Sequence, residues 1–131
     1  MRSSTRALGA AVVIAALGIS VPALLAAAAG EKLKQVSPEF VCMVNKKHFA
    51  KEQTLVSIEG RNYYACCDPC VKQLKENADS RKDVDPVSGK TVDKAKAAIG
   101  VDKQGNIYFF ENTDNLRKFR VPEKSAKSPG L

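Results

Sequence analysis

The feature that most restricts the fold of this chain is an internal repeat. Residues 58–74 match residues 103–119 at a spacing of 45 positions, which aligns Tyr63 with Tyr108. Each copy contains a β-prone run, a glycine-containing turn, an aromatic run and a short amphipathic segment, in that order. A single hairpin of this size is only marginally stable on its own. We therefore predict a small α+β fold in which two tandem β-hairpin-plus-helix units pack together.

The N-terminal segment differs in composition from the repeat. Residues 1–6 contain two arginines and no acidic residue, and residues 7–29 contain no charged residue at all. An apolar run that ends in the small-residue sequence Ala27-x-Ala29 is typical of a secretory signal peptide. We predict that residues 1–29 are a signal peptide and that the chain is exported to the periplasm or cell envelope. If the segment were not cleaved, it would be the only part of the chain in contact with the membrane.

The remainder of the chain is basic. Loss of Arg2 and Arg6 with the signal peptide lowers the formal net charge from +7 to +5. The lysines are interspersed with acidic residues rather than clustered, which favours a solvated surface over a nucleic-acid-binding surface. We expect no nucleic acid partner. Residues 123–131 lack apolar periodicity and are predicted to form a disordered tail.

All four cysteines lie in the first half of the predicted mature chain: Cys42, Cys66, Cys67 and Cys70. Cys66 and Cys70 are spaced to share one side of a helical turn, and the hairpin can bring Cys42 back to that turn. Thiolates at a helix start have lowered pKa values and bind soft ions such as Cu(I) and Zn(II). On an ideal helix Cys67 points about 100° away from Cys66. The pattern therefore predicts a soft-metal site in which Cys67 is secondary.

Two other uses of the cysteines remain open. Four cysteines in a small exported chain are typical of two disulfides, which would make this a disulfide-stapled interaction domain of the envelope. Three cysteines within five positions disfavour that interpretation, because short loops gain little from cross-linking. The pair Cys67 and Cys70 also has the spacing of a thiol-disulfide oxidoreductase, although residues 30–53 lack the strand and helix of a thioredoxin fold.

A few further side chains are candidates for a role. His48 is the only histidine in the chain and is more typical of a solvated loop than of a ligand. Met43 lies next to Cys42, but methionine more often fills space in a core. Tyr63 and Phe109 are also expected in the core, because alternate strand residues must face inward. We find no phosphate-binding loop, catalytic triad or paired carboxylates, and we expect no enzymatic activity.

The first copy contains the motif Tyr63-Tyr64-Ala65-Cys66-x-x-x-Cys70-x-x-x-Leu74, with Cys42 upstream. This arrangement resembles the strand-to-helix motif of the TRASH and YHS metal-binding domains. The resemblance implies a treble-clef-like unit over residues 36–78, with Cys42, Cys66 and Cys70 as metal ligands and Cys67 as a further candidate. It also implies a role in heavy-metal trafficking, resistance or sequestration, with a metal-efflux or metal-delivery protein as partner.

The second copy, over residues 84–122, resembles a YHS unit that has lost its cysteines. Ser88, Glu111 and Asn115 stand where the resemblance would place the three ligands. None of these is a soft ligand. We therefore expect the second copy to be degenerate and to contribute packing rather than a metal site.

Overall fold

The computed structural model of the chain describes residues 30–122. The predicted signal peptide at residues 1–29 and the predicted tail at residues 123–131 lie outside the described residues. Within residues 30–122, no helix is long and apolar enough to cross a membrane.

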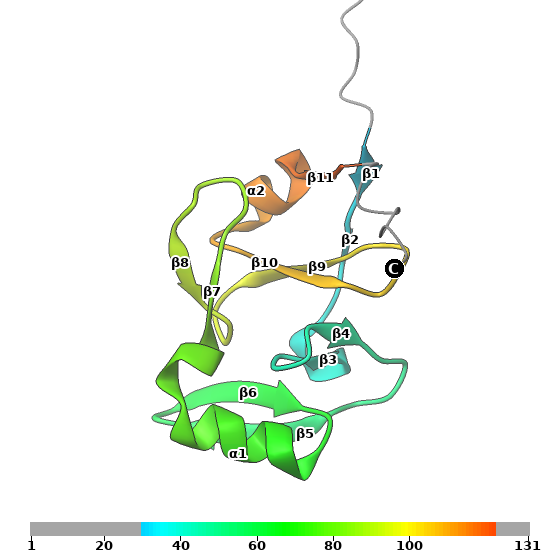
Figure 1. The fold of residues 1–131 in the computed structure, drawn as a ribbon. Coiled ribbons are helices and arrows are strands. Elements are labelled where there is room, and N and C mark those ends of the chain that lie inside the picture. The colour runs from blue at the N-terminus through cyan, green and yellow to red at the C-terminus, as the bar shows by residue number, and fades with distance from the viewer. Residues whose placement is uncertain (1–29, 123–131) are drawn as a thin grey trace, which may run out of the picture.

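The described residues form short strands arranged in several small antiparallel sheets, together with two α-helices and two 3-10 turns (Figure 1). In chain order the elements are β1 (Glu31–Lys32), β2 (Lys34–Gln35), η1 (Pro38–Phe40), β3 (Val41–Cys42), β4 (Lys47–His48), β5 (Thr54–Ile58), β6 (Arg61–Ala65), α1 (Asp68–Glu76), η2 (Ala78–Arg81), β7 (Lys82–Val84), β8 (Thr91–Asp93), β9 (Ala98–Val101), β10 (Ile107–Phe110), α2 (Thr113–Lys118) and β11 (Arg120–Val121). The fold is therefore a small mixture of strands and helices, as the sequence predicted.

The first predicted hairpin and helix are present as β5, β6 and α1. Glu59 and Gly60 form the turn between the strands, and both have positive φ, of 51° and 72°. Two successive positive φ angles match the turn that joins twisted antiparallel strands most easily. Val56 and Tyr63 pair across the hairpin and are buried. Helix α1 packs on this hairpin through the fully buried Leu74, so the predicted amphipathic face is the one that is covered.

The second predicted hairpin and helix are present as β9, β10 and α2. Alternate residues of β10 face opposite sides of the sheet. Tyr108 and Phe110 both contact Phe119 at the end of α2, with ring centroids 5.4 and 5.6 Å apart. Ile107 and Phe109 face the other way and belong to the core cluster that includes Tyr63 of the first hairpin. The sheet is thus covered by α2 on one face and by the rest of the molecule on the other (Figure 1).

Each hairpin-plus-helix is preceded by another tight antiparallel pair that the sequence did not reveal. β3 pairs with β4, and β7 pairs with β8. We refer to β3 through α1 as the first unit and to β7 through α2 as the second unit. In each unit the chain turns back through a residue with positive φ, which is Lys46 in the first and Gly89 in the second. The repeat is therefore longer than the sequence match suggested.

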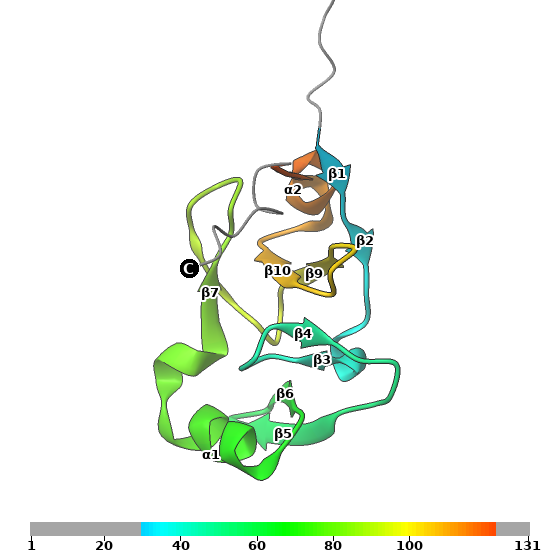
Figure 2. The same cartoon turned by 45° about the vertical axis from the view of Figure 1, so that its right-hand side comes forward.

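Residues before the first unit cross to the second one. β2 pairs with the edge of β9, and β1 pairs with β11 at the C-terminal end of the described chain. Leu33 lies against Gly100 so closely that a Cβ on this glycine would come within 2.8 Å of the leucine side chain. Figure 2 shows the N-terminal strands running down one side of β9 and β10 before they reach β3.

The two units also share buried polar contacts. The ammonium of Lys94, directly after β8, donates hydrogen bonds to the carbonyls of Met43 at 2.8 Å and Ser80 at 2.9 Å. It also lies 5.4 Å from the ring centroid of Phe109, where the face of the ring attracts a cation. Burial lowers the pKa of this lysine. A buried ammonium satisfied by one carbonyl of the first unit and one of η2 fixes how the units sit together.

Candidate metal centre

Three cysteine sulfurs converge in the first unit. The Sγ atoms of Cys42, Cys66 and Cys70 all lie within 4.8 Å of one another. Cys42 ends β3, Cys66 follows β6 directly, and Cys70 lies in the first turn of α1. Cys42 and Cys70 are buried, whereas Cys66 is half-buried. A group of three thiols that come from three separate elements is the arrangement predicted from the sequence, and it can hold a metal ion.

Backbone pairing brings the remote Cys42 to the other two. The N–H of Met43 donates a 2.9 Å hydrogen bond to the carbonyl of Tyr64, which joins the end of β3 to β6 just before Cys66. Met43 itself is fully buried, and its carbonyl accepts from Lys94. The position of Cys42 is therefore held from both units.

The spacing of the sulfurs suits a metal ion. The Sγ atoms of Cys66 and Cys70 are 3.9 Å apart. With Zn–S bonds of about 2.3 Å, sulfurs in a tetrahedral site lie about 3.8 Å from each other. All four cysteines are free thiols. An all-sulfur donor set favours soft ions over Mg²⁺ or Ca²⁺, which prefer oxygen.

The surroundings of Cys42 and Cys70 shift their thiol pKa values in opposite directions. Burial raises the pKa of the Cys42 thiol, but hydrogen bonds to its sulfur outweigh burial, so the net pKa is lowered. The donors are the backbone N–H of Asn45, the Cys66 thiol, and the backbone N–H groups of Cys66 and Val44. For Cys70 burial raises the pKa, and the neighbouring sulfurs raise it further. Cys42 is thus more acidic than Cys70, and a bound ion would displace the proton of Cys70.

Cys67 stands at the edge of this group. Its Sγ lies 3.1 Å from that of Cys70 and 3.8 Å from that of Cys66, but it is not one of the three sulfurs that converge. Cys67 is exposed, and it is the N-cap residue of α1 with φ −158° and ψ 163°. The hydrogen bond between the sulfurs of Cys67 and Cys70 lowers the pKa of Cys67. Since the helix begins after Cys67, its side chain does not follow the ideal helical direction on which the sequence prediction was based.

Asn45 is a residue of the site that the sequence did not predict. Its Nδ2 donates to the Sγ of Cys66 at 3.2 Å, within the range for a hydrogen bond to sulfur. The other two candidate ligands, His48 and Met43, lie apart from this contact. His48 is exposed on β4 and is not part of the group of three, and Met43 lies in the core. The only sequence signal for Asn45 as a site residue was its position shortly after Cys42. That signal is weak, because asparagine is common in turns for conformational reasons alone.

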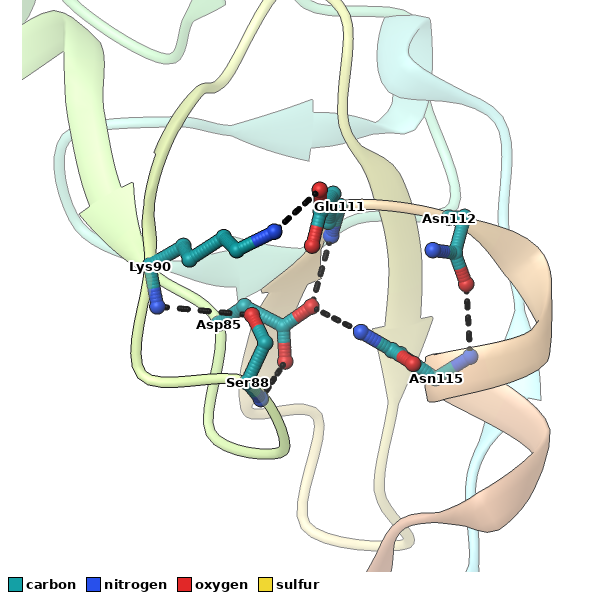
Figure 3. Close-up of polar contacts among 6 residues, drawn as sticks. All are labelled: Asp85, Ser88, Lys90, Glu111, Asn112 and Asn115. Carbon is teal, nitrogen blue, oxygen red and sulfur yellow. Dashed lines mark hydrogen bonds and ion pairs between the residues drawn. The ribbon is translucent and has the colours of Figure 1, made fainter.

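The second unit contains the same arrangement without sulfur, built around the fully buried Asp85 (Figure 3). Its Oδ2 accepts 2.8 Å hydrogen bonds from the backbone N–H of Glu111 and from Nδ2 of Asn115. Its Oδ1 accepts from the backbone N–H groups of Val87 and Ser88 at 2.7 and 3.2 Å. Burial raises the pKa of Asp85, but these donors more than offset burial and hold the pKa at about 2.

This network corrects one expectation. Asp85, and not Ser88, occupies the place of Cys42. The carbonyl of each accepts from a residue four positions on, which is Lys46 in the first unit and Gly89 in the second, and both of these have positive φ. Ser88 instead takes the place of Asn45. Glu111 points outward to pair with Lys90 at 3.2 Å, as Figure 3 shows.

No family model matches this chain, and no curated protein or solved structure shows significant similarity to it.

Proposed function

We propose that this chain is an exported binding protein for a soft heavy-metal ion, Cu(I) or Zn(II), held by Cys42, Cys66 and Cys70. The observation that carries the proposal is the convergence of three sulfurs within 4.8 Å, although Cys42 lies 24 residues before Cys66 in the sequence. Hydrophobic packing alone does not require three thiols at one point, and thiolate ligands select soft ions.

The environment of the group supports binding rather than catalysis. Cys42 and Cys70 are buried, and together with Cys66 they form the only cluster of three or more potential metal ligands within residues 30–122. The same position in the second unit carries Asp85, which cross-links its unit through hydrogen bonds. By analogy, a metal ion cross-links the first unit. The proposal agrees with the resemblance to TRASH and YHS domains and with a role in metal trafficking, resistance or sequestration.

A metal titration tests the proposal. The reduced chain, without oxygen, should bind one Cu(I) or one Zn(II), with proton release as the ion displaces thiol hydrogens. Cu(I) binding should produce a sulfur-to-metal charge-transfer band. The matched control is the same chain with its cysteines alkylated, which should bind neither ion. A reduced chain that binds neither ion at micromolar concentration would refute the proposal.

Export is tested separately. Intact-mass measurement of the protein recovered from the cell envelope should give a chain that begins near Gly30, because Ala27-x-Ala29 fits signal peptidase. Recovery of the protein only in the cytoplasm would contradict this part of the proposal and leave the metal centre unaffected.

One contact favours a second candidate, a thiol-disulfide exchange protein. The sulfurs of Cys67 and Cys70 are 3.1 Å apart, closer than those of Cys66 and Cys67 or of Cys66 and Cys70. This candidate function predicts that the metal-free chain reduces a protein disulfide catalytically and that loss of Cys67 abolishes that activity, whereas loss of Cys42 does not. The metal-binding proposal predicts no such turnover.

A further inference from the structure

We infer that Cys67 is the entry thiol of the metal centre: it takes the ion from a donor that carries it on thiolates and passes it to the buried cysteines. The inference rests on the proposed function and adds a route and a class of partner to it. The donor is either a small thiol or a protein with surface cysteines.

Accessibility is the first observation. Cys42 and Cys70 are buried and Cys66 is half-buried, so Cys67 is the one exposed thiol of the four. A buried site needs a path by which the ion enters. An ion bound first at Cys67 has the sulfur of Cys70 at 3.1 Å and that of Cys66 at 3.8 Å from the Cys67 sulfur. The sulfurs therefore form a continuous series from the surface to Cys42.

A comparison of the two units is the second observation. Cys67 and Asn112 are the N-cap residues of α1 and α2, with almost the same backbone angles, φ −158° and ψ 163° against φ −156° and ψ 169°. Asn112 caps its helix, because its Oδ1 accepts a 2.8 Å hydrogen bond from the N–H of Asn115. Cys67 has no such cap bond. Asparagine is among the best N-cap residues, so capping does not explain a cysteine here.

The transfer proceeds by ligand exchange. The sulfur of Cys67 forms a bond to the ion as one donor thiolate–metal bond breaks, and any proton on Cys67 passes to solvent. Bonds to Cys70, Cys66 and Cys42 then form in turn, each with loss of a thiol proton where one is present. The remaining donor bonds and finally the Cys67 bond break. The oxidation state of the ion does not change, and no other reactant is needed.

Transfer of Cu(I) from its glutathione complex to the full reduced chain, followed by stopped-flow absorbance, tests the inference. Two variants separate the thiol from the helix cap: Cys67→Asn removes the thiol and installs the cap of the second unit, and Cys67→Ala removes the thiol and installs no cap. Both should bind Cu(I) with an affinity within roughly fivefold of the wild-type chain, yet both should load and release it at least roughly tenfold more slowly. Circular dichroism confirms that α1 is intact in each variant.

The outcomes are distinct. Unchanged rates in the two variants would overturn the inference and leave the metal centre standing. A large loss of affinity in both would also overturn it, by making Cys67 a resident ligand. Slow transfer in only one of Cys67→Asn and Cys67→Ala would assign the effect to the helix cap and overturn it as well. If the wild-type chain bound neither Cu(I) nor Zn(II), the proposed function itself would fail.

Discussion

Asp85 lies in the second unit at the position that Cys42 holds in the first. The sulfur of Cys42 accepts hydrogen bonds from the backbone N–H groups two and three residues on and from that of Cys66. The carboxylate of Asp85 accepts from the backbone N–H groups two and three residues on and from that of Glu111. A carboxylate has two oxygens, and Oδ2 of Asp85 also accepts a hydrogen bond from the side chain of Asn115, which is the counterpart of Cys70. Hydrogen bonds therefore hold the elements of the second unit together at the place where a metal ion would hold those of the first unit together.

This correspondence predicts that a second metal site can be restored. The triple variant Asp85→Cys, Glu111→Cys, Asn115→Cys should bind two soft ions per chain instead of one, because it reproduces the converging thiols of the first unit. Native mass spectrometry of the reduced protein counts the ions. The matched control replaces Ser88 instead of Asp85, together with the same two residues, and should still bind one. Two ions in the control and one in the test variant would show that the correspondence is wrong.

Removal of the Asp85 charge should destabilise the fold. In Asp85→Asn a buried carboxylate that accepts from several N–H groups becomes an amide, and donors lose their acceptor. We expect a loss of about 2–3 kcal/mol in the free energy of unfolding, typical for buried hydrogen bonds to a charged group. Urea denaturation measures it. Asp114→Asn is the control, because this carboxylate is 79% exposed and should change stability little. Equal effects of the two changes would contradict a structural role for the network.

The same carboxylate should make stability depend on acidity. Its folded-state pKa of about 2 lies below the ordinary value of 3.8, so the unfolded chain binds the proton more readily. The contribution of Asp85 to the free energy of unfolding is therefore complete above about pH 4 and is lost as the pH falls through 2. It amounts to roughly 2 kcal/mol, because each unit of pKa shift corresponds to about 1.36 kcal/mol. Asp102, whose pKa is also lowered, adds to the fall. Asp85→Asn should lose stability less steeply between pH 4 and 2 than the wild-type chain, and parallel curves would exclude Asp85 as a source.

Lys94 should prove to be the strongest polar link between the two units. Replacement by methionine keeps the bulk but leaves the carbonyls of Met43 and Ser80 without their donor. We expect a loss on the order of 2–4 kcal/mol in unfolding free energy. Lys96→Met, at an exposed position two residues on, is the matched control and should be close to neutral. A Lys94→Met chain as stable as its control would show that Lys94 is not the strongest polar link and that other contacts, such as the ion pair of Arg61 with Asp93, hold the units together.

The sequence predicted the elements that carry strong periodic patterns. The hairpins β5–β6 and β9–β10 and the helices after them were found through aromatic runs, glycine turns and spaced apolar residues. The convergence of Cys42 with Cys66 and Cys70 was also predicted, because a hairpin must return the chain to its start. Each of these features leaves a regular pattern of residue types.

What the sequence did not predict lacks such a pattern. β1 and β2 are two-residue strands of charged and polar side chains, and they are specified by the strands they pair with rather than by their own residues. Asp85 was not among the side chains that the sequence singled out. Its correspondence to Cys42 was hidden because the two residues are 43 positions apart, whereas Tyr63 and Tyr108 are 45 positions apart. One added residue in the turn between β9 and β10 accounts for part of that shift.

The role of Cys42 separates a three-cysteine metal centre from a local cysteine pair. The most direct measurement is the Cu(I) affinity of Cys42→Ser and Cys67→Ser, by competition with a Cu(I) chelator under reducing conditions. Loss of one of three sulfur ligands should weaken binding at least about 100-fold in Cys42→Ser. Cys67→Ser should stay within roughly fivefold of the wild-type affinity, because only an entry ligand is lost. Intact affinity in Cys42→Ser together with abolished binding in Cys67→Ser would place the ion on Cys67 and Cys70 alone and contradict the metal centre described here.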